Sequence, residues 1–393
     1  MYRHYYESVN GGELACIDEQ IPFDIPDTWE WSRLSSVLLI ARGGSPRPIK
    51  DYLTNDENGV NWIKIGDTTK GSKYIFTTRE KIKPEGIAKS RLVKPGDFLL
   101  SNSMSFGRPY ILRTSGCIHD GWLVIRDSNG LFNKNYLYYY LSSNDLYCEF
   151  KKLAVGGVVN NLNSDIVRNV QVAIPPLSIQ RSIVSELDLL HSLIEKKQEQ
   201  LRALDNLAQS LFYQMFGDPI TNPMGWQVKK LGEVCGLKAG KSIKAVELQD
   251  YCEGLYPCYG GNGIRGYIGK YSHTENHSII GRQGALCGNI NYAIAPFYAT
   301  EHAVVVTPLI SMNDVWLFYS LMNLKLEQYA HGVAQPGLSV QDLVPISLPL
   351  PPLSLQQSFA AKVSAIEEQK RFISQSIKDV ESLLAQRMDH YFG

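Results

Sequence analysis

Two long stretches of the chain place apolar residues at alternating steps of four and three. The first stretch opens at Pro175-Pro176-Leu177-Ser178 and closes at Phe216-Gly217-Asp218-Pro219. Steps of four and three keep a narrow stripe on one side of a helix, which is the heptad seam of a coiled coil. The proline pair, Ser178 as N-cap and Gly217 predict where this helix begins and ends. The predicted seam residues are Ile183, Leu187, Leu190, Ile194, Lys197, Leu201, Leu204 and Leu211, with Lys197 in a polar slot.

The same stretch occurs a second time. Pro351-Pro352-Leu353-Ser354 repeats the opening and Phe392-Gly393 repeats the end, both at an offset of 176 (351 − 175 and 392 − 216). An offset held over a whole helix indicates an internal repeat rather than a chance match. The predicted seam residues of the second helix are Phe359, Val363, Ile366, Lys370, Ile373, Ile377, Val380 and Leu384. We expect the two helices to pair antiparallel, with a pseudo-two-fold axis relating the two halves of the chain.

A globular segment precedes each long helix. Trp29 and Trp226 open the two segments at an offset of 197 (226 − 29), and the same offset relates Ser45 to Ser242. The repeating unit is therefore a globular domain followed by a long helix. The predicted organisation is a lead-in over 1–17, a first domain over 18–175, a central long helix over 176–217, a second domain over 218–351 and a C-terminal long helix over 352–393.

Within both domains, short alternating or wholly apolar runs predict strands, and longer periodic runs predict helices. The expected strands are 61–67, 97–101, 122–125, 278–281 and 303–306, and the expected helices are 136–152 and 315–329. Many short strands beside a few helices predict an α+β fold for each domain.

Composition narrows the class of protein. No run of about 18 apolar residues occurs, and the polar N-terminal residues lack the apolar core of a signal peptide, so neither a membrane helix nor secretion is expected. The seven cysteines are scattered without a Cys-x-x-Cys pair, which favours reduced thiols in the cytoplasm over disulfides or a zinc site. Because the formal net charge is zero, any case for nucleic-acid binding must come from local patches.

The ordered set of motifs resembles the specificity (S) subunits of type I restriction–modification systems. The set comprises the tryptophans that open the domains and the two Pro-Pro-Leu-Ser helix entrances. It also comprises the approach Leu348-Pro349-Leu350-Pro351-Pro352 and the glycine-containing stretches 256–268 and 281–285. No single motif is decisive, but together they span almost the whole chain.

The resemblance implies a non-catalytic subunit with two tandem target-recognition domains, which recognises a bipartite double-stranded DNA target with one half-site per domain. It also implies two methyltransferase (M) subunits and, in the full enzyme, two restriction (R) subunits as partners, and no membrane partner. S-adenosylmethionine would bind the M subunits, and ATP with Mg²⁺ the R subunits. No catalytic residue, cofactor or metal is therefore expected in this chain.

Recognition of DNA requires cations for phosphates and Arg, Lys, Asn or Gln side chains at base edges. The candidates of the first domain are Arg42, Ser45 and Arg47 in a glycine-containing loop, Lys64, Lys70 and Lys73 in a basic segment, and Asn102, Ser103 and Arg108 after a predicted strand. Each group has a plainer explanation, namely a solvated turn, ordinary surface lysines and a hairpin turn.

The second domain offers a similar set. Its candidates are Lys238, Lys241 and Lys244 in the equivalent loop, Tyr259, Asn262 and Arg265 around three glycines, and Arg282 with Gln283. Glycine permits close backbone approach, and Asn or Arg can make bidentate base contacts. The Asn262-Gly263 pair also suits a type I′ hairpin, and both interpretations can hold together. His302 and His331 are interpreted as structural residues rather than as DNA contacts.

Other functions have weaker support in the residues. The segment 236–242 resembles a phosphate-binding P-loop, but three residues rather than four separate its glycines. A coiled-coil scaffold with two ligand-binding domains and no role on DNA stays open as the alternative function, as does a fused restriction enzyme. The polar seam residues Lys197, Lys370 and Arg387 suggest that a partner, as well as the second helix, contacts the seam.

Overall fold

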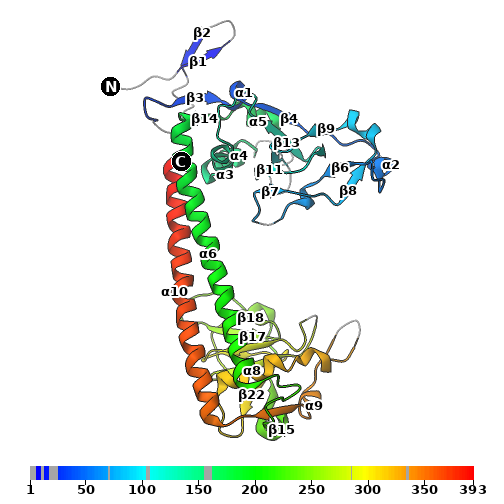
Figure 1. The fold of residues 1–393 in the computed structure, drawn as a ribbon, viewed down its shortest axis with the longest axis vertical. Helices are drawn as coiled ribbons and strands as arrows, with labels where there is room; N and C mark the ends of the chain where they lie inside the picture. Colours follow the sequence, from blue (N-terminus) through cyan, green and yellow to red (C-terminus); the bar gives the residue numbers. More distant parts are fainter. Residues whose placement is uncertain are drawn as a thin grey trace. The chain divides into compact units, whose positions relative to one another are not determined.

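The computed structural model describes residues 6–9, 13–16, 25–69, 71–102, 107–154, 162–284, 286–332 and 336–393. Contacts divide the chain into two compact units, Met1–Glu195 with Lys378–Gly393 and Lys196–Ile377 (Figure 1). Each unit holds one globular domain, the start of the long helix that follows this domain and the end of the other long helix. The two units are therefore built from equivalent parts of the repeat.

The first domain contains two five-stranded sheets and a strand pair. The first sheet has the order β4 (Leu39–Arg42), β13 (Trp122–Arg126), β10 (Phe98–Ser101), β11 (Pro109–Leu112) and β7 (Tyr74–Ile75). The second has the order β5 (Leu53–Thr54), β8 (Glu80–Ile82), β6 (Val60–Ile63), β12 (Gly116–Ile118) and β9 (Arg91–Val93). The pair is β3 (Glu30–Arg33) with β14 (Gln171–Ile174), and β1 (Tyr6–Val9) pairs with β2 (Glu13–Cys16) near the N-terminus.

Strand β10 is buried on both faces, which explains its continuous apolar sequence. Successive side chains of a strand point to opposite faces. Phe98 and Leu100 accordingly belong to a core cluster shared with α3 (Lys134–Ser142), whereas Leu99 packs in a separate cluster with Trp122. The strand is placed as expected from its sequence.

The helix expected over 136–152 is two helices, α3 and α4 (Asn144–Ala154). Ser143 separates them with an extended backbone (φ −63°, ψ 147°), so the prediction of one continuous helix was wrong. The hydroxyl of Ser143 accepts the N–H of Leu146 at 3.3 Å, a bond that is typical of serine at a helix start. The other helices among the described residues of this domain are α1 (Leu34–Val37), α2 (Ile49–Tyr52), α5 (Ser164–Asn169) and the 3₁₀ turns Ile65–Asp67 and Pro84–Lys89.

The second domain repeats this plan, with fewer strands among the residues that the structure describes. Its sheets are β16 (Cys235–Ala239), β22 (Ala303–Pro308), β19 (His277–Gly281) and β20 (Ile290–Ala293), then β18 (Gly263–Ile268), β17 (Tyr256–Gly260) and β21 (Tyr298–Ala299), and the pair β15 (Gln227–Lys230) with β23 (Ser347–Leu350). Its helices are α7 (Leu231–Val234), α8 (Asp314–Asn323), α9 (Val340–Leu343) and the 3₁₀ turns Ala245–Glu247 and Leu326–Tyr329. Because Gly236 lies within the paired strand β16, the segment 236–242 does not form a P-loop.

The helix expected over 315–329 ends earlier than predicted. Helix α8 stops at Asn323, and Lys325 adopts a left-handed conformation (φ 50°) before the 3₁₀ turn Leu326–Tyr329. A left-handed residue cannot continue a right-handed helix, so the apolar period alone overestimated the length.

The long helices α6 (Leu177–Phe216) and α10 (Leu353–Phe392) run antiparallel within each unit. In the first unit the end of α10 lies beside the start of α6, where Arg387 pairs with Glu186. In the second unit the start of α10 lies beside the end of α6, where Phe359 packs edge-on against Phe216 with ring centroids 5.3 Å apart. The predicted antiparallel pairing is confirmed.

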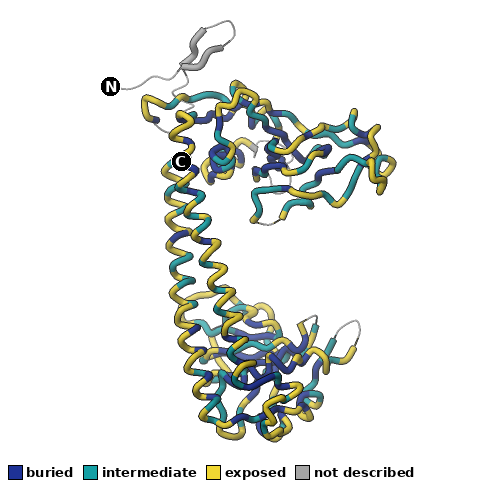
Figure 2. Tube along the Cα trace, viewed as in Figure 1, coloured by how far each residue is buried: buried dark blue, intermediate teal, exposed yellow. Residues whose placement is uncertain are grey.

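The predicted seam residues of both helices are all buried or half-buried, while exposed residues lie between them (Figure 2). Lys370 keeps its ammonium at the edge of the seam, 2.7 Å from Asp205 and 2.8 Å from Glu367, with 25% of its side chain exposed. The long stem of such a residue can cover apolar surface while its charge stays near water. The charge of Lys370 at this seam position is therefore paired with carboxylates of its own unit.

The repeat extends to single hydrogen bonds. The buried Gln180 donates from Nε2 to the carbonyl of Pro175 and accepts the N–H of Asn133 at 2.7 Å. In the second unit the buried Gln356 bonds Pro351 and the N–H of Asn313 in the same way, at 2.8 and 2.9 Å. Each asparagine caps the helix that begins there, α3 or α8, so each glutamine joins a long helix to its own domain.

Candidate nucleic-acid interface

The glycine-containing loop of the first domain follows β4 and lies against the turn between β12 and β13. Gly43 donates its N–H to the carbonyl of Trp122 at 2.9 Å, and Gly44 donates to that of Ile118 at 3.2 Å. A Cβ at position 43 would lie 2.1 Å from the carbonyl oxygen of His119. Glycine is therefore required at this position for the close approach of two backbones.

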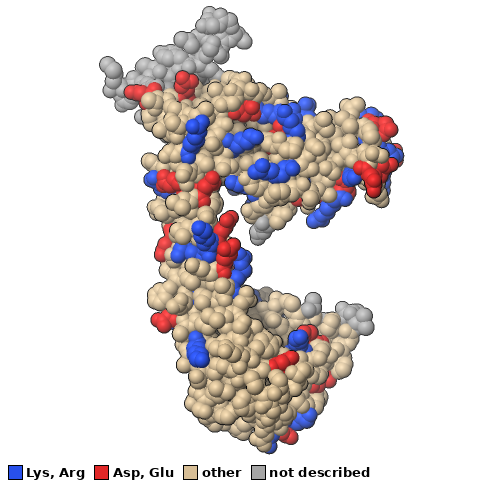
Figure 3. All heavy atoms as spheres, viewed as in Figure 1, with Lys and Arg blue, Asp and Glu red and all other residues tan. Residues whose placement is uncertain are grey.

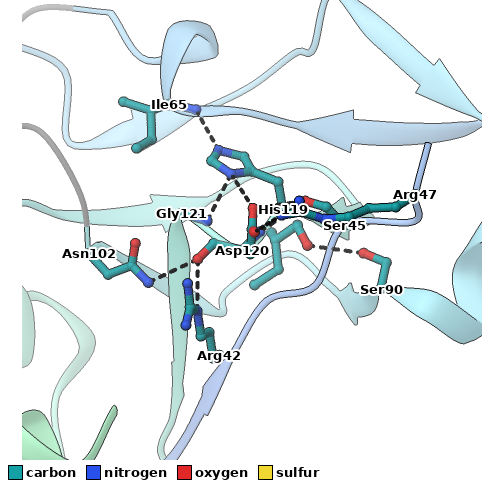
Figure 4. Close-up of polar contacts among 10 residues, drawn as sticks. Arg42, Ser45, Arg47, Ile65, Ser90, Asn102, His119, Asp120 and Gly121 are labelled. Carbon is teal, nitrogen blue, oxygen red and sulfur yellow. Dashed lines mark hydrogen bonds and ion pairs between the residues drawn. The ribbon is translucent and has the colours of Figure 1, made fainter. Parts of the chain in front are cut away.

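Asp120 is the centre of the hydrogen bonds around this loop (Figure 4). Its carboxylate accepts from Ser45 Oγ at 2.8 Å and from Arg47 Nη2 at 3.1 Å. Its backbone carbonyl accepts from Arg42 Nε and from Asn102 Nδ2, both at 3.0 Å. The structure thus brings together candidate residues from two separate stretches of sequence.

Asp120 is ionised at neutral pH. Partial burial acts to raise its pKa, but the hydrogen bonds from Ser45 and Arg47 outweigh burial and hold the pKa below its ordinary value. The Arg47 side chain is 80% exposed and uses only one of its N–H groups on Asp120. Its other donors face solvent, where they can meet a phosphate.

His119 precedes Asp120 and packs between the rings of Trp62 and Trp122. The N–H of Gly121 donates to its Nδ1 at 2.8 Å, and the N–H of Ile65 approaches its Nε2 at 3.3 Å. A neutral imidazole has one acceptor nitrogen, so the ring can accept only one of these two N–H groups at a time, and a protonated ring can accept neither. Burial lowers the pKa of His119 and keeps the ring neutral at pH 7, although the neighbouring Asp120 opposes this shift.

The second domain builds the equivalent loop with the same backbone bonds. Gly240 donates to the carbonyl of Ala303, and Lys241 donates to that of Ala299, both at 3.0 Å. Ser242 Oγ then donates to Glu301 Oε1 at 3.3 Å. Glu301 therefore occupies the place that Asp120 occupies in the first domain.

A second connection also recurs. Arg282 donates its N–H to the carbonyl of His302 at 3.0 Å and its Nη1 to that of Glu301 at 3.2 Å. Asn102 makes the corresponding bonds to Gly121 and Asp120 in the first domain. Equivalent backbone positions thus present the amide of Asn102 in the first domain and the guanidinium of Arg282 in the second domain.

The hairpin between β17 and β18 adds Asn262 and Arg265 to this side of the second domain. A Cβ at Gly281 would lie 2.4 Å from the carbonyl oxygen of Gly261, so the hairpin loop presses directly on the start of the Arg282 segment. Gly263, the first residue of β18, has positive φ (94°), but Asn262 does not, so the type I′ interpretation of this hairpin was wrong. Asn262 and Arg265 are exposed.

An open cavity of about 510 Å³ joins two further candidate segments of the first domain. It is lined by Arg108, by Gly71 and Ser72, and by the rings of Tyr110 and Tyr138, among others. The exposed Arg108 therefore lies beside the basic segment that contains Lys73.

The remaining candidates differ in exposure and in their partners. Lys64 pairs with Glu80 at 2.5 Å, and Lys73 lies 4.0 Å from Asp188. Asn102 is 4% exposed, and Tyr259 is 7% exposed in a core cluster with Phe297, so both act inside their domains. The exposed candidates are Arg42, Arg47, Arg108, Lys238, Lys241, Lys244, Asn262, Arg265 and Gln283. Lys70 and Ser103 lie outside the described residues.

The two histidines lie near carboxylates. His302 Nε2 is 3.4 Å from Glu301 Oε1, and His331 Nε2 is 3.3 Å from Asp342 Oδ1.

On the face drawn in Figure 3, basic and acidic side chains both appear over the first domain. Charge is thus mixed there, in keeping with the formal net charge of zero.

Asp120 and Glu301 were not among the sequence candidates. Acidic residues repel phosphate, so a search for cations and amides passes over them. One signal was present, because each carboxylate stands two positions before a predicted strand, at Trp122 and Ala303. Aligning the repeat through these strands would have paired the two acids.

The same sequence pattern recurs in known proteins. A sequence model of the type I restriction modification DNA specificity domain matches residues 26–203 and again residues 223–382. The EcoprrI type I restriction enzyme specificity subunit of Escherichia coli is 30% identical over 349 residues, which cover 84% of this chain and 86% of that protein. The chain belongs to the type I restriction–modification specificity subunits. The expected family is confirmed, and the matches favour it over the alternative of a scaffold unrelated to DNA.

A more distant specificity subunit, MjaIX of Methanocaldococcus jannaschii, is 23% identical over 387 residues, covering 88% of each chain. A chain in a solved structure on complex assembly and conformational transition of the type I R-M system superposes with a TM-score of 0.64 at 21% identity, covering 94% of this chain and 99% of that chain. The S subunit from M. genitalium gives a TM-score of 0.52 at 15% identity, with 93% and 97% covered. The fold of this specificity subunit, with tandem α+β domains and paired long helices, is confirmed.

Within the described part of the chain, none of the helices combines the length and the apolar character that crossing a bilayer requires. The described residues of this specificity subunit also include no group of three or more His, Cys, Asp or Glu side chains placed to hold a metal ion.

Proposed function

We propose that this specificity subunit recognises a split double-stranded DNA target, with one half-site contacted by each globular domain. The observation that carries the proposal is the set of backbone hydrogen bonds that both glycine-containing loops share. From these equivalent backbone positions the two domains present different side chains. Two loops with a similar backbone and unlike side chains are suited to two unlike half-sites. Neither domain needs to contact the bases between them.

The exposed candidate residues form two chemical groups, namely cations in both domains and amides in the second domain. Arg47, Lys241 and Lys244 are suited to phosphate, because they are exposed and carry charge. Asn262 and Gln283 are suited to base edges, because an amide can donate and accept at the same base. Sequence-independent attraction and sequence discrimination would then come from different residues.

The proposal places all catalysis in partner subunits. Two M subunits would bind S-adenosylmethionine and methylate the target, and two R subunits would use ATP with Mg²⁺. Exposed apolar side chains on the long helices support docking of M subunits there, since Leu189 of α6 is 69% exposed and Phe372 of α10 is 70% exposed. Burial of such side chains against a partner would contribute about 1.5–3 kcal/mol each.

Exchange of the first domain tests the function. Residues 18–175 are replaced by the first domain of another specificity subunit, the chimera is assembled with its M subunits, and methylated sites are mapped by sequencing. We expect one half-site to change while the other half-site and the spacer remain. A simultaneous change of both half-sites would contradict recognition by separate domains.

A further inference from the structure

We propose that Asp120 and Glu301 are equivalent positioning residues, each of which holds the cation-bearing loop of its own domain in the place from which that loop contacts DNA. The inference rests on the proposed function and deepens it. It assigns a role to two acids on a surface that otherwise needs positive charge.

The first step is the geometric equivalence of the two carboxylates. Each accepts from the serine of the loop, at 2.8 Å from Ser45 and 3.3 Å from Ser242. Their side chains are exposed to nearly the same extent, 38% for Asp120 and 37% for Glu301. The shared contact to the loop serine within two domains of different sequence indicates a shared task.

The second step concerns charge. A lone carboxylate near a phosphate is repelled by it, so an acid on a DNA-binding surface weakens binding unless it does something else. Asp120 is not alone, because Arg47 neutralises one of its oxygens at 3.1 Å and Ser45 satisfies the other. Both oxygens of the Asp120 carboxylate therefore hold the loop through hydrogen bonds.

The third step concerns what the loop gains. Arg47 would otherwise sample many rotamers, and the conformational entropy lost when such a side chain is ordered on binding lowers affinity. The bond to Asp120 orders the guanidinium in advance and leaves its other donors free for a phosphate. In the second domain the carboxylate fixes Ser242 between Lys241 and Lys244, so the loop backbone rather than one cation is placed.

The test uses the complex of the chain with its M subunits and a duplex carrying its mapped target. Binding is measured by fluorescence anisotropy for wild type, Asp120→Ala, Asp120→Asn, Asp120→Glu and Glu301→Ala. Each is titrated against the full target and against duplexes altered in one half-site only. Asp165→Asn is the matched control, because Asp165 also pairs with an arginine of the first domain, Arg168 at 3.0 Å, but makes no bond to the loop.

We expect Asp120→Ala to weaken binding about tenfold, which corresponds to about 1.4 kcal/mol. We also expect it to reduce discrimination at the half-site of the first domain only, because phosphate contacts fix the register in which a domain meets the bases of its own half-site. Glu301→Ala should do the same at the other half-site. Asp120→Asn should fall between wild type and alanine, because it keeps an acceptor for Ser45 but loses the charge for Arg47, and Asp120→Glu should restore part of the loss.

Tighter binding by Asp120→Asn would overturn the proposal, since it would show that the negative charge of Asp120 repels DNA more than its bond to Arg47 favours binding. Equal losses at both half-sites would also overturn it, because they would point to a general defect of folding or assembly. A wild-type complex that recognises no split target would instead refute the proposed function itself. The two failures are therefore distinguishable.

Discussion

At the scale of single residues, polar side chains determine how the pieces of each domain are joined. Gln180 and Gln356 are almost fully buried, and each satisfies both a carbonyl of its helix entrance and the N–H of a helix-capping asparagine. Removal of either amide would leave these backbone groups unpaired, at a cost of about 1–3 kcal/mol for each buried group. Each glutamine thereby joins the start of a long helix to the helix-capping asparagine of its own domain.

The first prediction concerns His119 and pH. Burial lowers its folded-state pKa below the ordinary 6.5, so the unfolded chain binds the proton more readily. The contribution of neutral His119 to the free energy of unfolding is therefore complete above about pH 6.5, and it is lost as the pH falls through the folded-state pKa. Protonated His119 cannot accept the N–H of Gly121, so hydrogen exchange of that amide, corrected for its intrinsic rate, should accelerate on acidification.

Two controls isolate this effect. His119→Asn keeps an acceptor but does not titrate, so its Gly121 amide should exchange with little additional dependence on pH. The amide of Gly43, which bonds the carbonyl of Trp122 instead, should respond less than that of Gly121. Equal acceleration of both amides would show that acid loosens the whole domain rather than this one contact.

The residue scale also shows where sequence analysis succeeded. Arg42, Ser45 and Arg47 were recognisable because cations and glycines lie together in one short segment. Asp120 was not, because it bonds Ser45 across 75 positions of the chain. No local pattern records a hydrogen bond between such distant segments.

At the scale of elements, the long helices were predicted more closely than the helices of the domains. Their heptad steps run over many turns, and prolines and glycines bound them at both ends. The domain helices are short, and local backbone geometry ended them early, at Ser143 in one case and near Lys325 in the other. A periodic pattern gives the type of such an element more reliably than its length.

The second prediction compares two phenylalanines of α10. Phe359 is fully buried between the end of α6 and the second domain, whereas Phe372 is 70% exposed. We expect Phe359→Ala to lower the free energy of unfolding of the second unit by about 3–5 kcal/mol, because a large cavity forms in its core. Phe372→Ala should change it by no more than about 0.5 kcal/mol.

Urea unfolding of the full chain, followed by tryptophan fluorescence, measures both values. Trp316 lies beside Phe216 in the same core and reports on this unit. Comparable effects of the two substitutions would contradict the burial seen here. If Phe372→Ala leaves stability intact but weakens association with M subunits, it also supports docking on the exposed face of the helices.

At the scale of the whole molecule, the internal repeat is the main organising fact. Each unit combines a domain, the start of its own long helix and the end of the other, so neither half of the sequence completes a unit alone. In the proposed function this sharing of helices between the two units has a role, because the paired helices would set the separation of the two half-sites.

The third prediction follows from that role. Seven residues are inserted after Lys197 in α6, and seven in the paired region of α10 after Ile377, so that both seams keep their heptad register. Seven residues add about 10 Å of helix, at 1.5 Å each. We expect the spacer of the methylated target to lengthen by about three base pairs, at 3.4 Å each, with both half-sites unchanged.

Insertion into α6 alone is the control, since it shifts one seam against the other and should reduce stability rather than lengthen the spacer. Mapping of methylated sites by sequencing measures the outcome. An unchanged spacer in the doubly extended and stable protein would rule out the helices as the determinant of spacing.

The sequence by itself determined the repeat, the two long helices with their seams, and the family. These features are written in local periodicity and in motifs at constant offsets, which a linear chain displays without folding. Only the tertiary structure decided that Asp120 and Glu301 organise the candidate DNA-binding loops, and that Asn102 and Tyr259 are enclosed. These facts depend on which distant segments meet, and that is settled by packing and hydrogen bonding in three dimensions.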